Sequence, residues 1–194
     1  LQGDAKFTSL GARRQTLVIG RTATAPTLDG VCQPAEYPGA LQVDIGSGTG
    51  FLYNTDTDLY ACISGMTNGV KATAKISIDG LRDIWSYDFN ALPLSNDFRF
   101  SVEKTGALFA EQGDGAAFVP FSPPAGSWEA AATEQSGVYW SAEFRLSQSL
   151  IGVGFTGPGY SFGMLLTESV SGQPEQHAPG GGRACGGAPD RQRV

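Results

Sequence analysis

The chain has 194 residues, of which 41% are hydrophobic and 16% charged, with 27 glycines, 11 prolines and a net charge of −6. This length fits one domain with extensions or at most two small ones, and no apolar run approaches the length of a membrane span. The frequent glycines and prolines indicate the many turns of an all-β protein.

Residues 1–24 are expected to form an N-terminal extension. The chain begins with Leu1, which indicates that a leader was removed and the protein exported, although a trimmed chain would look the same. Thr16–Ile19 is a β-prone run flanked by arginines, suited to adding a strand to the sheet edge of a neighbouring copy. The residues assigned to this assembly segment are Arg13, Arg14, Leu17, Val18 and Ile19.

From Ala25-Pro26 onward, short runs of alternating apolar and polar residues predict strands separated by Gly, Asn and Asp turns. About ten strands at this spacing predict an antiparallel two-sheet β-sandwich, of jelly-roll or immunoglobulin-like type, over residues 25–171. Residues 147–151 are expected to form one helical turn, and residues 172–194 a Gly/Pro-rich tail. The expected strands cover residues 41–45, 51–53, 59–63, 70–78, 84–89, 98–102, 108–109, 118–119, 128–132, 139–146 and 161–170.

The three cysteines fit an exported protein. Cys32 follows the Asp29-Gly30 turn and Cys62 lies in the strand 59–63, so we expect these two to form a disulfide. The alternative is that Cys62 is simply a small buried residue. Cys185 in the tail is left over, as a free thiol or a bridge to another chain. We therefore expect an extracellular or cell-surface location after signal-peptide removal.

The charge is distributed unevenly along the chain. Residues 25–171 hold 6 basic and 16 acidic side chains, a net charge of −10, whereas residues 1–24 and 172–194 carry +3 and +1. An acidic body argues against nucleic acid as its partner. It also offers an attraction between the ends of one molecule and the body of another, although acidic proteins with basic tails also arise by chance.

Two segments about a hundred residues apart carry a family resemblance. The first is Thr27–Val31, followed by Leu59–Ala61; the second is Val138–Leu146, running into Leu150–Gly152. Over roughly residues 25–170 this pattern of a Leu-Asp-Gly turn and a Trp-x-x-Glu strand resembles the family 9 carbohydrate-binding modules and the wider DOMON-like β-sandwiches. The resemblance implies a β-sandwich; a fold alone does not determine function.

Modules of that family bind sugar rings between aromatic side chains, because the C–H face of a ring is apolar and its rim forms hydrogen bonds. Trp85, Tyr87 and Trp128 are the candidate platforms. Trp140 matches the strand tryptophan of the family and shares a face with Phe144, which favours the core. Packing in the core or at its rim is the alternative for all three tryptophans.

The sequence shows no catalytic constellation, so we expect neither an enzyme nor a cofactor. His177, the only histidine, lies in the tail, and a haem site with Met66 or Met164 has no supporting context. Residues 54–58 could bind calcium through alternating oxygen side chains, but they lack the glycine and distal glutamate of an EF-hand loop. A hairpin turn is the better interpretation.

Two functions are compatible with these features. The first is a structural subunit that assembles with copies of itself into a surface filament or pilus-like fibre through its terminal arms. The second is a secreted carbohydrate-binding or adhesive module with glycans as partners. The β-prone extension and the opposite charges of the ends and the body favour the first.

Overall fold

The computed structural model describes residues 2–6, 14–21, 24–45, 48–67, 72–79, 92–152 and 163–170. Within these ranges it holds one short 3-10 helix, η1 (Pro34–Glu36), and no helix that is long and apolar enough to cross a membrane. The strands are β1 (Gln2–Lys6), β2 (Arg14–Val18), β3 (Gly20–Arg21), β4 (Leu41–Ile45), β5 (Gly48–Asn54), β6 (Asp58–Thr67), β7 (Ala72–Asp79), β8 (Asp97–Glu103), β9 (Leu108–Gly113), β10 (Phe118–Pro120), β11 (Trp128–Glu134), β12 (Tyr139–Ser147) and β13 (Gly163–Val170).

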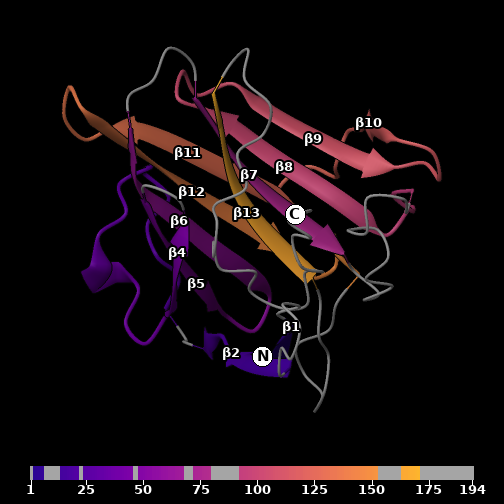
Figure 1. Ribbon diagram of the computed structural model, residues 1–194, viewed down its shortest axis with the longest axis horizontal. Helices are drawn as coiled ribbons and strands as arrows, with labels where there is room; N and C mark the ends of the chain where they lie inside the picture. The colour runs from indigo at the N-terminus through magenta and orange to yellow at the C-terminus, as the bar shows by residue number, and fades with distance from the viewer. Residues whose placement is uncertain are drawn as a thin grey trace, which may run out of the picture.

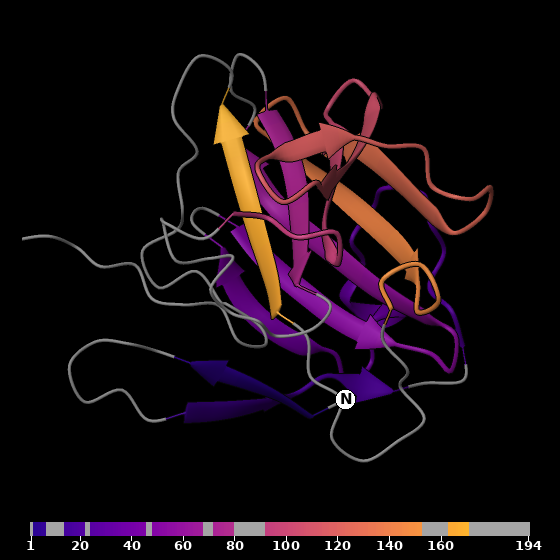
Figure 2. The ribbon, with the colours of Figure 1, turned by 90° about the vertical axis from the view of Figure 1, so that its right-hand side faces the viewer.

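Two sheets pack face to face as a sandwich (Figure 1), and the view turned by 90° shows the same two layers (Figure 2). The five-stranded sheet has the order β10-β9-β8-β7-β13, and the six-stranded sheet has the order β11-β12-β6-β5-β3 with β4 also paired to β5. Neighbouring strands in both sheets are antiparallel, except for the short parallel pair of β3 and β5. The predicted all-β sandwich is therefore confirmed.

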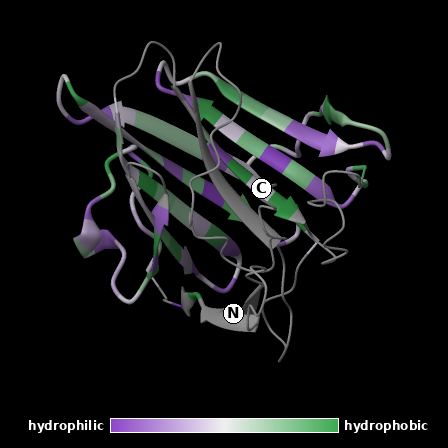
Figure 3. Ribbon diagram, viewed as in Figure 1, coloured by the Kyte–Doolittle hydropathy of each residue, from purple (hydrophilic) through white to green (hydrophobic). Residues whose placement is uncertain are grey.

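Alternation along single strands builds the core between the sheets. In β8, Phe98, Phe100 and Val102 are buried and face the six-stranded sheet, and Figure 3 shows hydrophobic and hydrophilic residues alternating along this strand. In β12, Trp140 and Phe144 are 0% exposed, as the sequence predicts. Alternate residues of these strands therefore point into the core, and the residues between them point to the outer face of the sheet.

Part of the N-terminal segment joins the sandwich. β1 and β2 form a separate two-stranded antiparallel sheet, whereas β3 pairs with β5 of the six-stranded sheet. Ile19, one of the residues assigned to assembly, is 1% exposed and belongs to the core cluster. The end of the expected extension therefore lies within its own sandwich.

Residues 24–40, which we call the strap, cross the outer face of the six-stranded sheet. Tyr37 of the strap packs with Tyr53, Tyr60 and Cys62 in a second small core on that outer face. Tyr37 and Tyr53 meet edge to face, with ring centroids 6.0 Å apart. Cys32 of the strap and Cys62 of β6 form a disulfide with their Cα atoms 5.7 Å apart. The strap is thus fastened to the sheet both covalently and by aromatic packing.

Residues 147–151, where the sequence predicts one helical turn, form a turn in which the Leu150 N–H donates to the Ser147 carbonyl over 3.1 Å.

Several other sequence predictions concern residues outside the described ranges. The predictions that lie outside are the strand at 84–89 with Trp85 and Tyr87, Arg13 of the assembly segment, the tail 172–194, His177 and Cys185.

Candidate functional site

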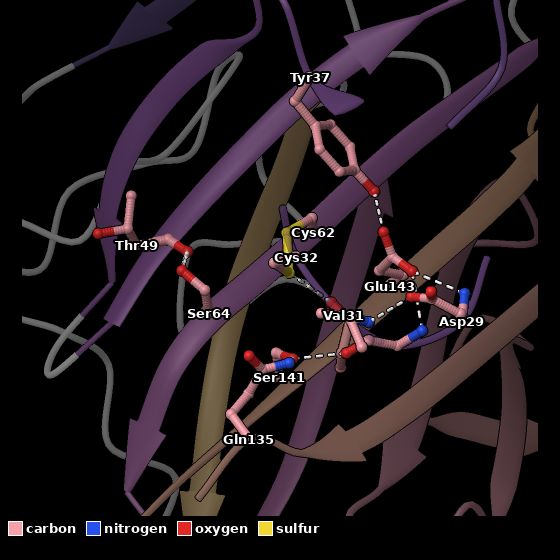
Figure 4. The surroundings of a disulfide bond; sticks show 12 residues. Asp29, Val31, Cys32, Tyr37, Thr49, Cys62, Ser64, Gln135, Ser141 and Glu143 are labelled. Atoms are coloured by element: carbon pink, nitrogen blue, oxygen red, sulfur yellow. Dashed lines mark hydrogen bonds between the residues drawn. A yellow bond between two sulfur atoms is a disulfide. The ribbon is translucent and has the colours of Figure 1, made fainter. Parts of the chain in front are cut away.

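A buried carboxylate holds the strap against β12 (Figure 4). Glu143 points to the outer face of the six-stranded sheet and is 0% exposed beneath the strap. Its Oε2 accepts hydrogen bonds from the backbone N–H groups of Asp29 and Gly30, over 2.9 Å and 2.8 Å, and its Oε1 accepts one from the Tyr37 hydroxyl over 2.5 Å. We call this arrangement the Glu143 latch.

The turn that faces the latch requires glycine. Gly30 has φ of +81°, and a Cβ there would lie 2.8 Å from the carbonyl carbon of Ala132 in β11. The carbonyl of Asp29 accepts a hydrogen bond from the Thr133 hydroxyl over 2.8 Å, which fixes the turn to the sheet. The Leu-Asp-Gly turn and the Trp-x-x-Glu strand of the sequence are therefore the two halves of one tertiary contact.

Burial and hydrogen bonding act in opposite directions on the latch. Burial raises the pKa of Glu143, while the hydrogen bonds from Tyr37 and from the backbone of Gly30 and Asp29 lower it; burial prevails. Burial also raises the pKa of Tyr37, and the neighbouring Glu143 raises it further. Since both carboxylate oxygens are engaged and shielded from solvent, Glu143 serves the fold and is not available to a ligand.

The hairpin turn at residues 54–58 is held by protein groups. The Thr55 N–H donates to the Asp58 carbonyl over 2.9 Å, and Arg21 Nε donates to Asp56 Oδ1 over 2.7 Å. Arg145 donates to Asp58 Oδ1 over 2.8 Å. Across the ranges that the structure describes, no group of three or more His, Cys, Asp or Glu side chains is placed to hold a metal ion. Arg21 and Arg145 thus balance the charges of Asp56 and Asp58 in this turn.

Trp128, one of the predicted platforms, faces the space between the sheets. It is half-buried at the start of β11, and its ring centroid lies 5.2 Å from that of Phe100 in β8. Phe98 and Phe121 complete an aromatic cluster at this edge of the sandwich. The inward direction follows from its register, because Trp128 pairs with Leu146, a core residue of β12.

We expect Trp128→Ala to lower the free energy of unfolding by about 2–3 kcal/mol, because it removes a large side chain from the aromatic cluster. Thermal or urea unfolding measures this change. If Trp128 instead acts as a sugar platform, the variant keeps its melting temperature and loses glycan retention.

Exposed apolar side chains gather at the β9–β10 side of the five-stranded sheet. In the described part of the chain, seven large hydrophobic residues are exposed, and five of them lie on β9, on β10 or in the segment before β8 that packs against Gly113 and Gly115. Such a concentration marks an interaction site more than scattered exposure does. The five are Leu92, Leu94, Leu108, Phe109 and Val119.

The outer face of this sheet combines aromatic and polar side chains, and we call it the β8–β10 face. Phe109 is 49% exposed and pairs with Ser101, so it points away from the core. Arg99 and Glu111 are a second outward pair in the same register, and the Arg99 guanidinium carbon lies 3.7 Å from the centroid of the Phe118 ring. The face therefore offers an aromatic plane beside hydrogen-bond donors and acceptors.

The sequence predicts a strand at residues 108–109 and indicates no ligand-binding role for them. The direction of Phe109 depends on its pairing with Ser101, which no local pattern discloses. Trp85 and Tyr87 lie outside the described residues, so their role stays a prediction.

No protein-family model matches the chain, and no curated protein matches it. Among solved structures, a candidate carbohydrate-binding protein from Bacteroides uniformis is similar, with 10% identity, a TM-score of 0.53 and coverage of 83% of this chain and 86% of that one. A family 9 carbohydrate-binding module from Caldicellulosiruptor kristjanssonii in complex with cellotriose has 13% identity, a TM-score of 0.49 and coverage of 81% and 80%. Its complex with glucose has 11% identity, a TM-score of 0.49 and coverage of 79% of both chains. At these identities the similarity concerns the fold.

Proposed function

We propose that the chain is a non-catalytic, extracellular carbohydrate-binding module that stacks a sugar ring on the β8–β10 face. The observation that carries the proposal is Phe109, a half-exposed aromatic side chain on a regular sheet, with the partly exposed side chains of Arg99 and Glu111 beside it. The apolar C–H face of a pyranose packs on such a ring, and its hydroxyls bond to the surrounding polar groups.

Two further observations support the proposal. The Bacteroides uniformis protein with the same fold is itself a candidate carbohydrate-binding protein. The Cys32–Cys62 disulfide is typical of proteins in oxidising, extracellular surroundings. Trp85 and Tyr87 remain additional candidate platforms in this proposal.

The filament hypothesis has less support. Ile19 is buried in the core of its own domain, and β3 adds to its own sheet. Arg14, Leu17 and Val18 lie in β2, which pairs with β1 of the same chain. The segment that we expected to be donated to a neighbour therefore has partners within the molecule.

The test is Phe109→Ala on an array of glycans, because Phe109 is the proposed stacking surface. We expect retention to fall about tenfold or more, with little change in melting temperature because the side chain is half exposed. Tyr139→Ala is the matched control: Tyr139 is 47% exposed and lies on β12 of the other sheet. Equal retention by both variants contradicts the proposal, and so does the absence of any retained glycan for the unmodified protein.

A further inference from the structure

We infer that the β8–β10 face binds a glycan bearing carboxylates, that is, a uronate-containing polysaccharide, and that Arg99 is the residue that selects the carboxylate. This inference rests on the proposed carbohydrate binding and adds the chemical class of the ligand.

Arg99 lies over an aromatic ring and has no carboxylate partner among the residues that the structure describes. Its guanidinium carbon is 3.7 Å from the centroid of the Phe118 ring, within the range of a cation–π contact. Glu111 stands directly opposite Arg99 in the strand register, yet among the described residues Arg99 forms no ion pair or hydrogen bond. Gly113, which precedes the turn to β10, pairs with Phe118 and puts no side chain between Arg99 and that ring.

The other two arginines whose side chains the structure describes are both paired with carboxylates. Arg21 pairs with Asp56, and Arg145 pairs with Asp58 and Glu129. Those arginines stabilise turns and strands of the protein itself. Arg99 differs because its planar guanidinium lies on the Phe118 ring and donates to no carboxylate in the described ranges. A guanidinium in this state matches a carboxylate, which accepts two parallel hydrogen bonds from it.

The spacing suits a single sugar unit. Phe109 pairs with Ser101, two residues along β8 from Arg99, so the two side chains are diagonal neighbours about 7–8 Å apart at their bases. A uronate ring stacked on Phe109 can direct its carboxylate to Arg99. Glu111, between them on β9, can accept hydrogen bonds from ring hydroxyls. In this arrangement Phe109 contacts the apolar face of the sugar, Glu111 its hydroxyls and Arg99 its carboxylate.

The acidic net charge of the protein limits long-range attraction but not this contact. With a net charge of −6, the protein as a whole repels a polyanion at low salt. Charges farther apart than about 8 Å are largely screened at physiological ionic strength, whereas a close bidentate contact is screened much less. We therefore expect uronate binding to persist, or to strengthen slightly, as salt is raised to about 0.15 M.

The experiment is affinity electrophoresis of the full chain in gels containing alginate, polygalacturonate or heparosan, each compared with its carboxyl-reduced, neutral form. We expect at least one uronate polymer to be retained and its reduced form to bind about tenfold more weakly. Arg99→Met is expected to remove that preference, and Arg99→Lys to restore part of it, since lysine keeps the charge without the fork. Arg21→Met, which also removes one positive charge from an exposed position, is the control and leaves the preference intact.

Three results overturn the inference. One is equal retention of the native and carboxyl-reduced polymers, another is the retention of neutral glycans alone, and the third is a preference that survives Arg99→Met. In the first two cases, if Phe109→Ala still abolishes retention, carbohydrate binding stands and only the ligand class is wrong. If no glycan of either kind is retained, both proposals fall together.

Discussion

Replacing Glu143 by alanine is expected to lower the free energy of unfolding by about 3–5 kcal/mol, a decrease of about 10 °C in melting temperature for a domain of this size. The substitution leaves the N–H groups of Asp29 and Gly30 and the hydroxyl of Tyr37 without their acceptor beneath the strap. Buried donors that lose a charged acceptor carry a larger penalty than the net value of the bonds themselves. Thermal unfolding of the purified chain measures the effect.

Glu143→Gln separates hydrogen bonding from charge. The amide oxygen can accept from Asp29 and Gly30, and the amide nitrogen can donate to the oxygen of Tyr37, so we expect stability within about 1 kcal/mol of the unmodified protein at neutral pH. A loss as large as that of the alanine variant contradicts this account of the latch. Preserved stability in both variants shows that the strap does not depend on residue 143.

The same pair of variants gives a pH dependence with a defined sign. Burial holds the pKa of Glu143 in the folded state above its ordinary value of about 4.3. The protonated form therefore contributes stability that is fully present below that ordinary value and is lost as the pH rises through the raised folded value. Glu143→Gln cannot titrate, so this part of the pH profile disappears in urea unfolding measured from pH 4 to pH 7.

Removing the disulfide should have the second large effect. Cys32 and Cys62 are 30 residues apart, and opening a loop of that length is expected to lower stability by about 3–4 kcal/mol through the entropy of the unfolded chain. The double variant Cys32→Ala/Cys62→Ala, compared with the oxidised chain in urea, tests this. The β8–β10 face lies on the other sheet, so glycan retention at low temperature should be unchanged.

Cys185→Ala serves as the control for that experiment. It removes the remaining cysteine while leaving the Cys32–Cys62 bridge intact, so its stability should equal that of the unmodified chain. An unfolding midpoint of the double variant that also equals it would mean that aromatic packing of Tyr37 against Tyr53 and Tyr60 suffices to hold the strap.

Strand positions followed from the sequence, because alternation with a period of two is a local property. Residues 98–102 and 139–146 alternate clearly and form β8 and β12. Local sequence patterns do not predict the hydrogen bonds of Asp29 and Gly30 to Glu143, because these residues are more than a hundred positions apart. The family resemblance drew attention to both segments, but only the folded chain shows that one binds the other.

The candidate site was harder to predict for a related reason. Trp128 is a natural choice for a platform by residue type, yet its register with Leu146 turns it inward. Phe109 lies in a weakly patterned segment, and its register with Ser101 turns it outward. The face of the sheet on which a side chain lies is set by the pairing between strands. A shift of one residue in register would turn Trp128 outward and Phe109 inward.

The brevity of β10 has a consequence for how copies of this protein behave when crowded. This outermost strand comprises three residues and ends in Pro120, which has no N–H to offer. A short edge strand that ends in proline offers few backbone groups for hydrogen bonding to a strand of another molecule, and so disfavours amyloid-like stacking. This edge of the five-stranded sheet therefore offers little backbone to a second copy, although several exposed apolar side chains lie next to it.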